Sequence, residues 1–130
     1  MKGRSISPGR AEGEAIVSPE PIGFYGGIDA QTGIVIEKGH PLEGQSVTGK
    51  VLVFPNGKGS TVGSYVIYGL KKNGVGPVAI VNRETETIVA TGAILAGIPC
   101  VDGIDIDRIR TGDRVVVNAD EGTVEVKGGP

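Results

Sequence analysis

The sequence has very few of the side chains that hold soft metals or form crosslinks. Cys100 is its single cysteine and His40 its single histidine. One cysteine cannot form a disulfide within the chain. The two residues together cannot supply a zinc tetrad of the Cys/His kind or the thiolates of an iron–sulfur cluster. We therefore expect this chain to bind no metal or cofactor of its own, so that any demanding metal chemistry would need a partner to bring the metal.

Long apolar runs and runs of like charge are also missing. No apolar run approaches the ~18 residues that a membrane span needs, and the opening stretch MKGRSISPGR lacks the apolar centre of a signal peptide. The formal net charge is −2, without the clustered lysine and arginine of a nucleic-acid or anionic-membrane surface. These features predict a cytoplasmic protein that binds neither nucleic acid nor membrane.

Glycine is the residue type present in excess. The chain of 130 residues contains 23 glycines, where average usage would give about nine. The glycines lie between apolar segments, which is typical of turns in a compact, strand-rich domain. The length predicts one domain, residues 1–130.

The order of apolar segments predicts an α/β fold. A fully apolar, β-branched strand at 78–81 is typical of a covered sheet. Helical spacing predicts helices at 62–72 and 85–96, and alternation predicts a hairpin within 114–126. We expect a mixed, partly barrel-like sheet with helices on one side. Residues 1–12 have little apolar content, so we expect them to be loosely held or to act as an arm.

A glycine-rich loop between a strand and a helix is the part around which the rest is organised. An apolar strand at 50–54 is broken by PNGKG at 55–59, and Ser60 and Thr61 then open a helix. A helix N-terminus has unpaired N–H groups and a partial positive charge, so it attracts anions. The glycines allow the backbone to approach a ligand closely.

Two interpretations of this loop stay open at this point. In the first, Ser or Thr caps the helix and the loop binds nothing. In the second, the loop binds or acts on a ligand, as its place at the carboxyl end of a strand favours. Ser60 could then be a nucleophile, a donor or a base, because neighbouring N–H groups would stabilise its charged form. The lone His40 gives little support to a serine hydrolase triad.

The other reactive residues favour structural interpretations. We interpret His40 as a surface or turn residue and Cys100 as a buried, inert thiol. Three aspartates near a turn lack the spacing of a calcium loop, and a solvated turn is the better interpretation; they are Asp102, Asp105 and Asp107. Arg4 and Arg10 could clamp a carboxylate or phosphate, or could belong to a solvated tail.

Four segments together resemble the small subunit of the aconitase X family: FYGGID at 24–29, TG at 32–33, HPLEGQSVTGKVL at 40–52 and GKGSTVGS at 57–64. The resemblance covers essentially the whole chain and is far more specific than the glycine loop alone. It implies a swivelling β/β/α domain, equivalent to the mobile domain of aconitase. It also implies a large partner subunit, in a heterodimer or a higher assembly, that carries an iron–sulfur cluster.

The resemblance also implies roles for residues of the loop. Ser60 matches the serine that removes the substrate proton, while the cluster iron of the large subunit helps the hydroxyl to leave as water. Lys58, Gly59 and Thr61 match the substrate-binding loop around that serine. Aconitase has an arginine two residues past the serine, where this chain has Val62, so anion recognition must come from elsewhere.

Archaeal members of the family imply a substrate. They form a hydro-lyase that dehydrates (R)-5-phosphomevalonate, a phosphorylated hydroxy acid, to trans-anhydromevalonate 5-phosphate in a modified mevalonate pathway of isoprenoid biosynthesis. One alternative is the small subunit of a cis-3-hydroxyproline dehydratase, although bacterial relatives of that kind typically have a second serine where this chain has Thr61. The other alternative is a non-catalytic module that binds anions.

Overall fold

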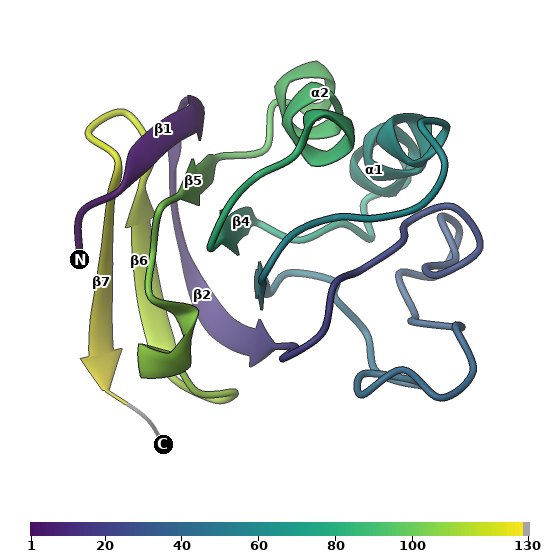
Figure 1. Ribbon diagram of the computed structural model, residues 1–130, viewed down its shortest axis with the longest axis horizontal. Helices are drawn as coiled ribbons and strands as arrows, with labels where there is room; N and C mark the ends of the chain where they lie inside the picture. Colours follow the sequence, from purple (N-terminus) through teal and green to yellow (C-terminus); the bar gives the residue numbers. More distant parts are fainter. Residues whose placement is uncertain (129–130) are drawn as a thin grey trace.

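The computed structural model describes residues 1–128 and shows a curled sheet with two helices on one side (Figure 1). The helices are α1 (Gly63–Lys72) and α2 (Thr87–Ala96), and a short 3-10 turn, η1, spans Ile106–Arg108. The described strands are β1 (Arg4–Ser7), β2 (Arg10–Val17), β3 (Val51–Phe54), β4 (Ala79–Asn82), β5 (Cys100–Asp102), β6 (Arg114–Asn118) and β7 (Thr123–Gly128). The predicted strand, helices and hairpin are confirmed, with bounds shifted by one or two residues.

The strands form one mixed sheet in the order β1-β5-β4-β3-β2-β6-β7. The four central strands, β2 to β5, run parallel, while β1, β6 and β7 pair antiparallel. Strand β2 bends the sheet, because its first half pairs with β6 and its last residues, from Ala15 to Val17, pair with β3. The predicted mixed, partly barrel-like sheet is thus confirmed.

The first residues of the chain are part of this sheet, so the expectation of a loose tail or arm is wrong. Arg4 pairs with Asp102 through β1 and β5. Lys2 forms a bridge with Thr123 of β7, and the Gly3 N–H donates to the Gly122 carbonyl over 2.7 Å. The two outer strands of the sheet therefore meet, as Figure 1 shows at its left edge. Main-chain pairing orders this segment despite its low apolar content.

Two apolar cores lie on the two faces of the parallel strands. Leu52 and Phe54 of β3 point to the side of the helices, whereas Val51 and Val53 point into the curl of the sheet, towards β6. All four side chains are fully buried. Strands that are covered on both faces have continuous apolar sequences, which explains why β3 and β4 could be read from the sequence.

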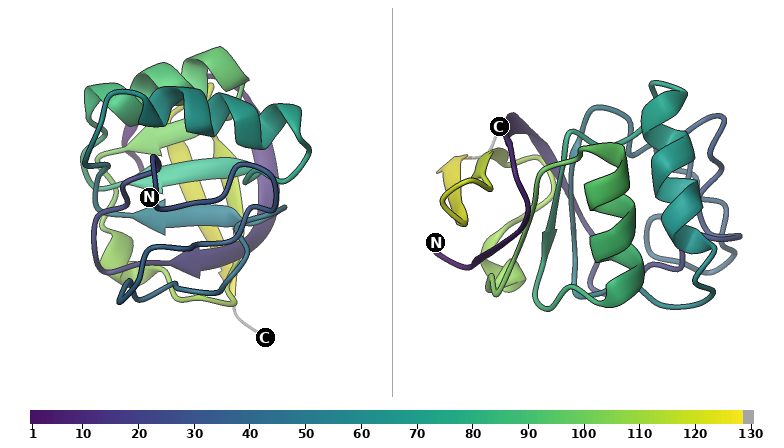
Figure 2. Two further views of the ribbon diagram at one scale, coloured as in Figure 1. Left: turned by 90° about the vertical axis from the view of Figure 1, so that its right-hand side faces the viewer. Right: turned by 90° about the horizontal axis from the view of Figure 1, so that it is seen from above.

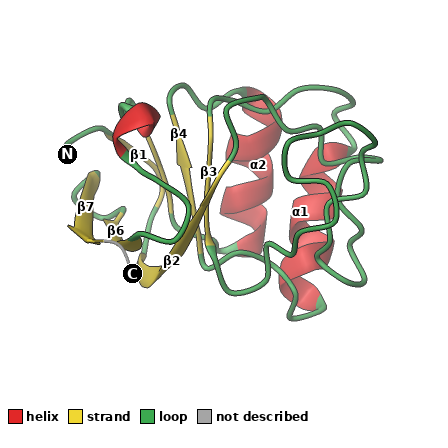
Figure 3. Ribbon diagram, turned by 90° about the horizontal axis from the view of Figure 1, so that it is seen from below, coloured by secondary structure: helices red, strands yellow, loops and turns green. Residues whose placement is uncertain are grey.

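Both helices cover the same face of the sheet (Figures 2 and 3). Ile67 and Leu70 of α1 and Val89 and Ala93 of α2 are fully buried in the core beneath them. The helices approach closely at Gly92, where a Cβ atom would come within 2.7 Å of Ile67 Cδ1. Neither helix of the described residues is long and apolar enough to cross a membrane.

A long connection, residues 18–50, links β2 to β3 and packs beside α1 (Figure 1). It contains no named strand or helix, and isolated bridges join Ile28 to Val35 and Ile34 to Ser46. Phe24 anchors it to the core by an edge contact with Phe54, at 5.8 Å between ring centroids. The connection therefore forms a wall next to the loop that follows β3.

Candidate active site at the β3–α1 loop

The glycine loop, residues 55–62, leaves β3 at the edge of the sheet where all four parallel strands end. Its base is held firmly. Gly57 bridges to Ile22, and the Lys58 N–H donates to the Ile22 carbonyl over 3.0 Å. Gly57 is also buried against α2. A Cβ atom at this position would overlap Glu86 Oε1 and lie within 2.6 Å of Val89 Cγ2. These contacts fix the point from which the exposed part of the loop extends.

The predicted site residues lie together at the exposed part of this loop. Lys58, Gly59, Ser60 and Thr61 are all exposed. Gly59 has a φ of +88°, a backbone conformation that favours glycine. The Ser60 hydroxyl therefore sits on an open surface directly after a glycine that turns the chain.

Neither Ser60 nor Thr61 is the N-cap residue of helix α1, so that part of the first interpretation is wrong. The N-cap residue is Val62, and no side chain bonds to the helix terminus there. Instead, Ser60 Oγ accepts a hydrogen bond from the Val62 N–H over 3.2 Å. Among residues 1–128, no acceptor is in place for the Ser60 hydroxyl proton. Serine hydroxyls that receive local backbone N–H groups are common in turns, but this one is also open to a ligand.

The free main-chain donors lie in the loop before α1 rather than in the first turn of the helix, where the sequence predicts them. The first helical N–H groups, of Gly63 and Ser64, donate to the carbonyls of Ser60 and Thr61 over 2.9 and 3.2 Å. In contrast, the N–H groups of Gly59, Ser60 and Thr61 find no acceptor within the described chain. Donors of this kind stabilise an oxyanion or bind a carboxylate or phosphate. The loop can therefore support negative charge at or next to Ser60.

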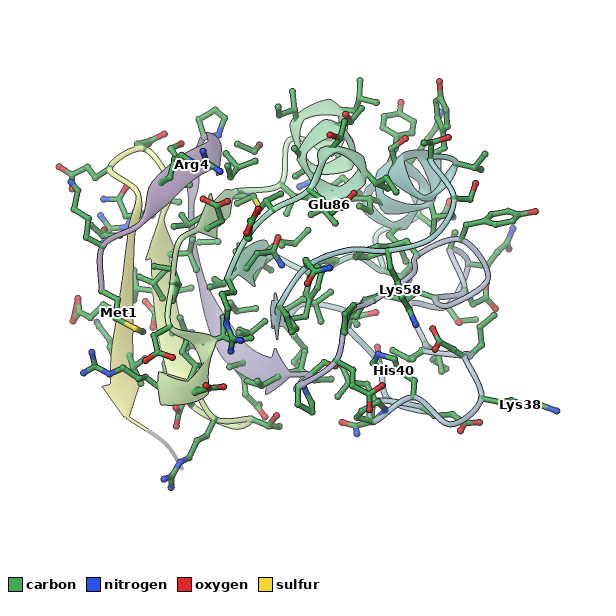
Figure 4. All side chains as sticks on the ribbon, in the orientation of Figure 1. Met1, Arg4, Lys38, His40, Lys58 and Glu86 are labelled. Atoms are coloured by element: carbon green, nitrogen blue, oxygen red, sulfur yellow. The ribbon has the colours of Figure 1, made fainter. Side chains whose placement is uncertain are left out.

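Lys58 brings a positive charge to the same loop. Its Nζ lies 3.4 Å from Glu37 Oε2, and both side chains are partly exposed. Figure 4 shows Lys58 pointing towards the 18–50 connection, which also carries His40. A surface ion pair of this geometry is weak, so an anionic ligand could compete with Glu37 for Lys58.

Arg4 and Arg10 do not join this loop. Arg4 clamps Asp102 with two hydrogen bonds, of 3.0 Å from Nε and 2.8 Å from Nη2. Arg10 lies at the amino end of β2, opposite Asn118, while Ser60 follows the carboxyl end of the parallel strand β3. Arg4 therefore does clamp an anion, as the sequence suggested, but that anion is the Asp102 carboxylate of the same chain.

Sequence reasoning missed the polar network around Asp102, whose side chain is almost fully buried. Burial alone would raise the pKa of Asp102, but the Arg4 guanidinium and the Thr85 N–H outweigh it and lower the pKa. The Thr85 hydroxyl in turn donates to Asn82 Oδ1 over 2.8 Å. Asp102 was interpreted as part of a solvated turn, which is wrong, because β1 covers it. This network braces the carboxyl ends of β4 and β5.

His40 and Cys100 have structural roles. His40 lies in a turn, as predicted, but it is only 6% exposed, so the interpretation as a surface residue is wrong. Its Nδ1 accepts from the Leu42 N–H over 3.0 Å and its Nε2 lies 3.1 Å from the Pro21 carbonyl. Cys100 is fully buried, and burial raises its pKa to about 12. The interpretation of Cys100 as a buried, inert thiol is confirmed.

The described residues do not fit an iron–sulfur cluster or another metal centre. No group of three or more His, Cys, Asp or Glu side chains within residues 1–128 is placed to hold a metal ion. A buried thiol with a raised pKa is also a poor metal ligand, because the thiolate is the binding form. Any cluster chemistry therefore needs ligands that this part of the chain does not supply.

Ser60 is exposed and does not line the best-formed hollow of the described chain. A hollow of about 350 Å³ lies elsewhere, between β2 and the start of β3, and is lined by Glu14, Ala15, Ile16, Gln45, Ser46, Lys50 and Thr111. None of these residues belongs to the β3–α1 loop. Enzyme sites are normally concave, so an enzyme site at Ser60 would need a second surface to close it.

Comparisons with known proteins agree with this geometry. The family model described as the aconitase X swivel domain matches residues 1–126. The phosphomevalonate dehydratase small subunit of Thermococcus onnurineus is 63% identical over 98% of this chain and 98% of its own length. That of Thermococcus gammatolerans is 60% identical over 99% and 98%. The crystal structure of Thermococcus kodakaraensis aconitase X in its holo-form superposes with a TM-score of 0.95 at 59% identity, over 96% of this chain and 95% of that chain. On these matches, over nearly its full length, the chain belongs to the aconitase X swivel-domain family.

Proposed function

We propose that this chain is the small subunit of a heteromeric iron–sulfur hydro-lyase that dehydrates (R)-5-phosphomevalonate in the mevalonate pathway, and that Ser60 is its catalytic base. The names of the relatives support the reaction and the substrate. The observation that carries the role of Ser60 is the hydrogen bond from the Val62 N–H to its exposed Oγ. The same names favour phosphomevalonate over a cis-3-hydroxyproline.

Dehydration needs a base next to the substrate carboxylate. Ser60 takes the proton from the carbon beside that carboxylate, and hydroxide leaves the neighbouring carbon. The proton that Ser60 then gives up and this hydroxide together make one water, and the product is trans-anhydromevalonate 5-phosphate. Ser60 takes the proton in its oxyanion form. The Val62 N–H favours that form, because a hydrogen bond to the charged state stabilises it. The free N–H groups of Gly59 and Thr61 add positive potential next to it.

The remaining predicted residues have binding roles in this proposal. Lys58 attracts a substrate carboxylate or phosphate, and its weak pair with Glu37 leaves it available. Gly59 and Thr61 line the site, where Gly59 lets the main chain approach the ligand. The large subunit supplies the iron–sulfur cluster and the other wall of the site, because residues 1–128 provide no cluster ligands. When bound there, the cluster would activate the departing hydroxyl.

Reconstitution with the large subunit under anaerobic conditions tests the base. We expect Ser60→Ala to fold normally and to lower kcat by about 100-fold or more, the usual contribution of a general base. Ser46→Ala is a matched control, since Ser46 Oγ also accepts from a main-chain N–H two residues on, at 3.1 Å, but lies away from this loop. Near-normal turnover by Ser60→Ala would refute the assignment.

The non-catalytic alternative is tested with the isolated chain. A half-site should bind (R)-5-phosphomevalonate weakly in an NMR titration, because most contacts come from the large subunit. Saturation at micromolar concentration, with shifts at Gly59 and Ser60, would instead favour an anion-binding module. Lys58→Met, measured in the reconstituted enzyme, should raise KM more than it lowers kcat if Lys58 binds the substrate.

A further inference from the structure

The aromatic residues divide sharply between the core and one face of the molecule. The two phenylalanines, Phe24 and Phe54, are buried. The three tyrosines are exposed, Tyr25 at 64%, Tyr65 at 68% and Tyr68 at 43%. No tyrosine hydroxyl forms a hydrogen bond with another residue of the described chain. Large apolar rings that are free on a surface mark an interaction site when they gather.

Two of the tyrosines follow the candidate base along α1, and the main chain of the third lies at the start of that helix. Tyr65 and Tyr68 lie on the outer stripe of α1, away from Ile67 and Leu70, which pack into the core. The main chain of Tyr25 lies against the start of the same helix, since a Cβ atom at Gly63 would come within 3.6 Å of its nitrogen. Val62, the residue before the helix, is also 46% exposed. We call Tyr25, Val62, Tyr65 and Tyr68 the tyrosine face.

We propose that the tyrosine face is the surface on which the large subunit docks. The proposal rests on the proposed function, which places the substrate between Ser60 and the large subunit. Val62 follows Ser60 by two residues, and its N–H bonds to the Ser60 hydroxyl. A partner that closes over Ser60 must therefore reach the start of α1, where Val62 and the main chain of Tyr25 lie and from which Tyr65 and Tyr68 follow on the exposed side of the helix. The interface with the large subunit would therefore be continuous with the site at Ser60.

The chemistry of the face suits a stable protein partner. Tyrosine is enriched in the central parts of interfaces, where it combines a large apolar area with a polar end and few rotamers to fix. Lys72 lies at the margin of the face, with its Nζ 5.9 Å from the centroid of the Tyr68 ring. A charged residue is typical of the rim of an interface rather than of its centre.

The test measures the affinity of the full chain for the large subunit, by calorimetry under anaerobic conditions. We expect Tyr65→Ala and Tyr25→Ala each to raise Kd by about tenfold or more, as truncation of an interface anchor does. Leu95→Ala is the matched control, because Leu95 is a large apolar residue and 53% exposed. It lies near the carboxyl end of α2, whereas the start of α1 lies against Ile88 near the amino end of α2. This control should change Kd by less than twofold.

Outcomes of this test separate the docking surface from the role of Ser60. Ser60→Ala should bind the large subunit with wild-type affinity while it loses turnover. Wild-type Kd values for both tyrosine variants would overturn the docking surface and leave the base assignment standing. The other possible occupant of the face is a second copy of this chain, and sedimentation of the isolated chain measures whether it forms a homodimer. A homodimer that Tyr65→Ala converts to a monomer would assign the face to a second copy and overturn the proposal.

Discussion

The Glu86 carboxylate occupies the space that a side chain at Gly57 would need. Oε1 of Glu86 also accepts from the Val89 N–H over 2.9 Å, and Oε2 accepts from the Ile88 N–H over 2.8 Å. One carboxylate thus caps α2 and supports the base of the loop that carries Ser60. The loop position is therefore coupled to the N-terminus of the neighbouring helix.

Gly57→Ala should disturb both elements at once. The added methyl group would displace the Glu86 cap and press on Val89 Cγ2, 2.6 Å away. We expect the free energy of unfolding to fall by about 1–3 kcal/mol, as for other overpacked sites, and turnover to fall because Ser60 moves. Urea unfolding and reconstituted kcat measure the two effects. Wild-type values for both would contradict the coupling.

Gly92→Ala should destabilise the helix pair. Alanine normally favours a helix over glycine by up to about 1 kcal/mol. Here its Cβ would lie 2.7 Å from Ile67 Cδ1 and 3.1 Å from the Ser64 carbonyl oxygen, so we expect a net loss of about 1–3 kcal/mol. Gly69→Ala, which would meet only Ala30 Cβ at 3.5 Å, should be neutral or stabilising. A higher unfolding midpoint for Gly92→Ala would be incompatible with the close helix approach.

Arg4→Ala should lower stability in a pH-dependent way. The folded pKa of Asp102 is lowered, so its contribution is present above the unfolded pKa, about 3.9, and is lost as the pH falls through the folded pKa. The difference in thermal midpoint between wild type and Arg4→Ala should therefore be largest near pH 7 and shrink below about pH 4. Arg10→Ala, which removes a guanidinium without an ion pair to the described residues, is the control. A difference that grows in acid would refute this account.

Cys100 should be unreactive in the folded protein. Its thiol is fully buried and its pKa is raised to about 12 by burial, so almost no thiolate exists at pH 8. An aromatic disulfide reagent should label the native chain only as fast as it unfolds, and should label it at once in concentrated urea. Rapid labelling of the native protein would show that β5 opens locally.

The segments that could be predicted are those whose burial follows from their own pattern of apolar residues. The apolar strands β3 and β4, both helices and the β6–β7 hairpin carry their own periodicity. The position of Ser60 after a strand and a glycine turn was also readable. Strand β1 was not, because its order depends on partners far along the chain, such as the carbonyl of Ala93 that accepts from the Ser7 hydroxyl over 3.3 Å.

Details of the candidate site depended on the backbone rather than on residue types. A serine before a helix can cap it or form a tighter turn, and the αR conformation of Val62, with φ −61° and ψ −19°, decides for the turn. No residue pattern reports that angle. Likewise, the burial of His40 depends on the Pro21 carbonyl, 19 residues earlier in the chain, within a connection that has no periodicity to read.

The meeting of the outer strands has a consequence for how the protein is made. Lys2 pairs with Thr123, and the Val124 N–H donates to the Met1 carbonyl over 2.8 Å. During synthesis on the ribosome, the first residues must therefore wait, unpaired, until the segment around Thr123 has emerged. The parallel strands and helices could assemble before that moment, but the curl of the sheet could close only after residues 123 and 124 have left the ribosome.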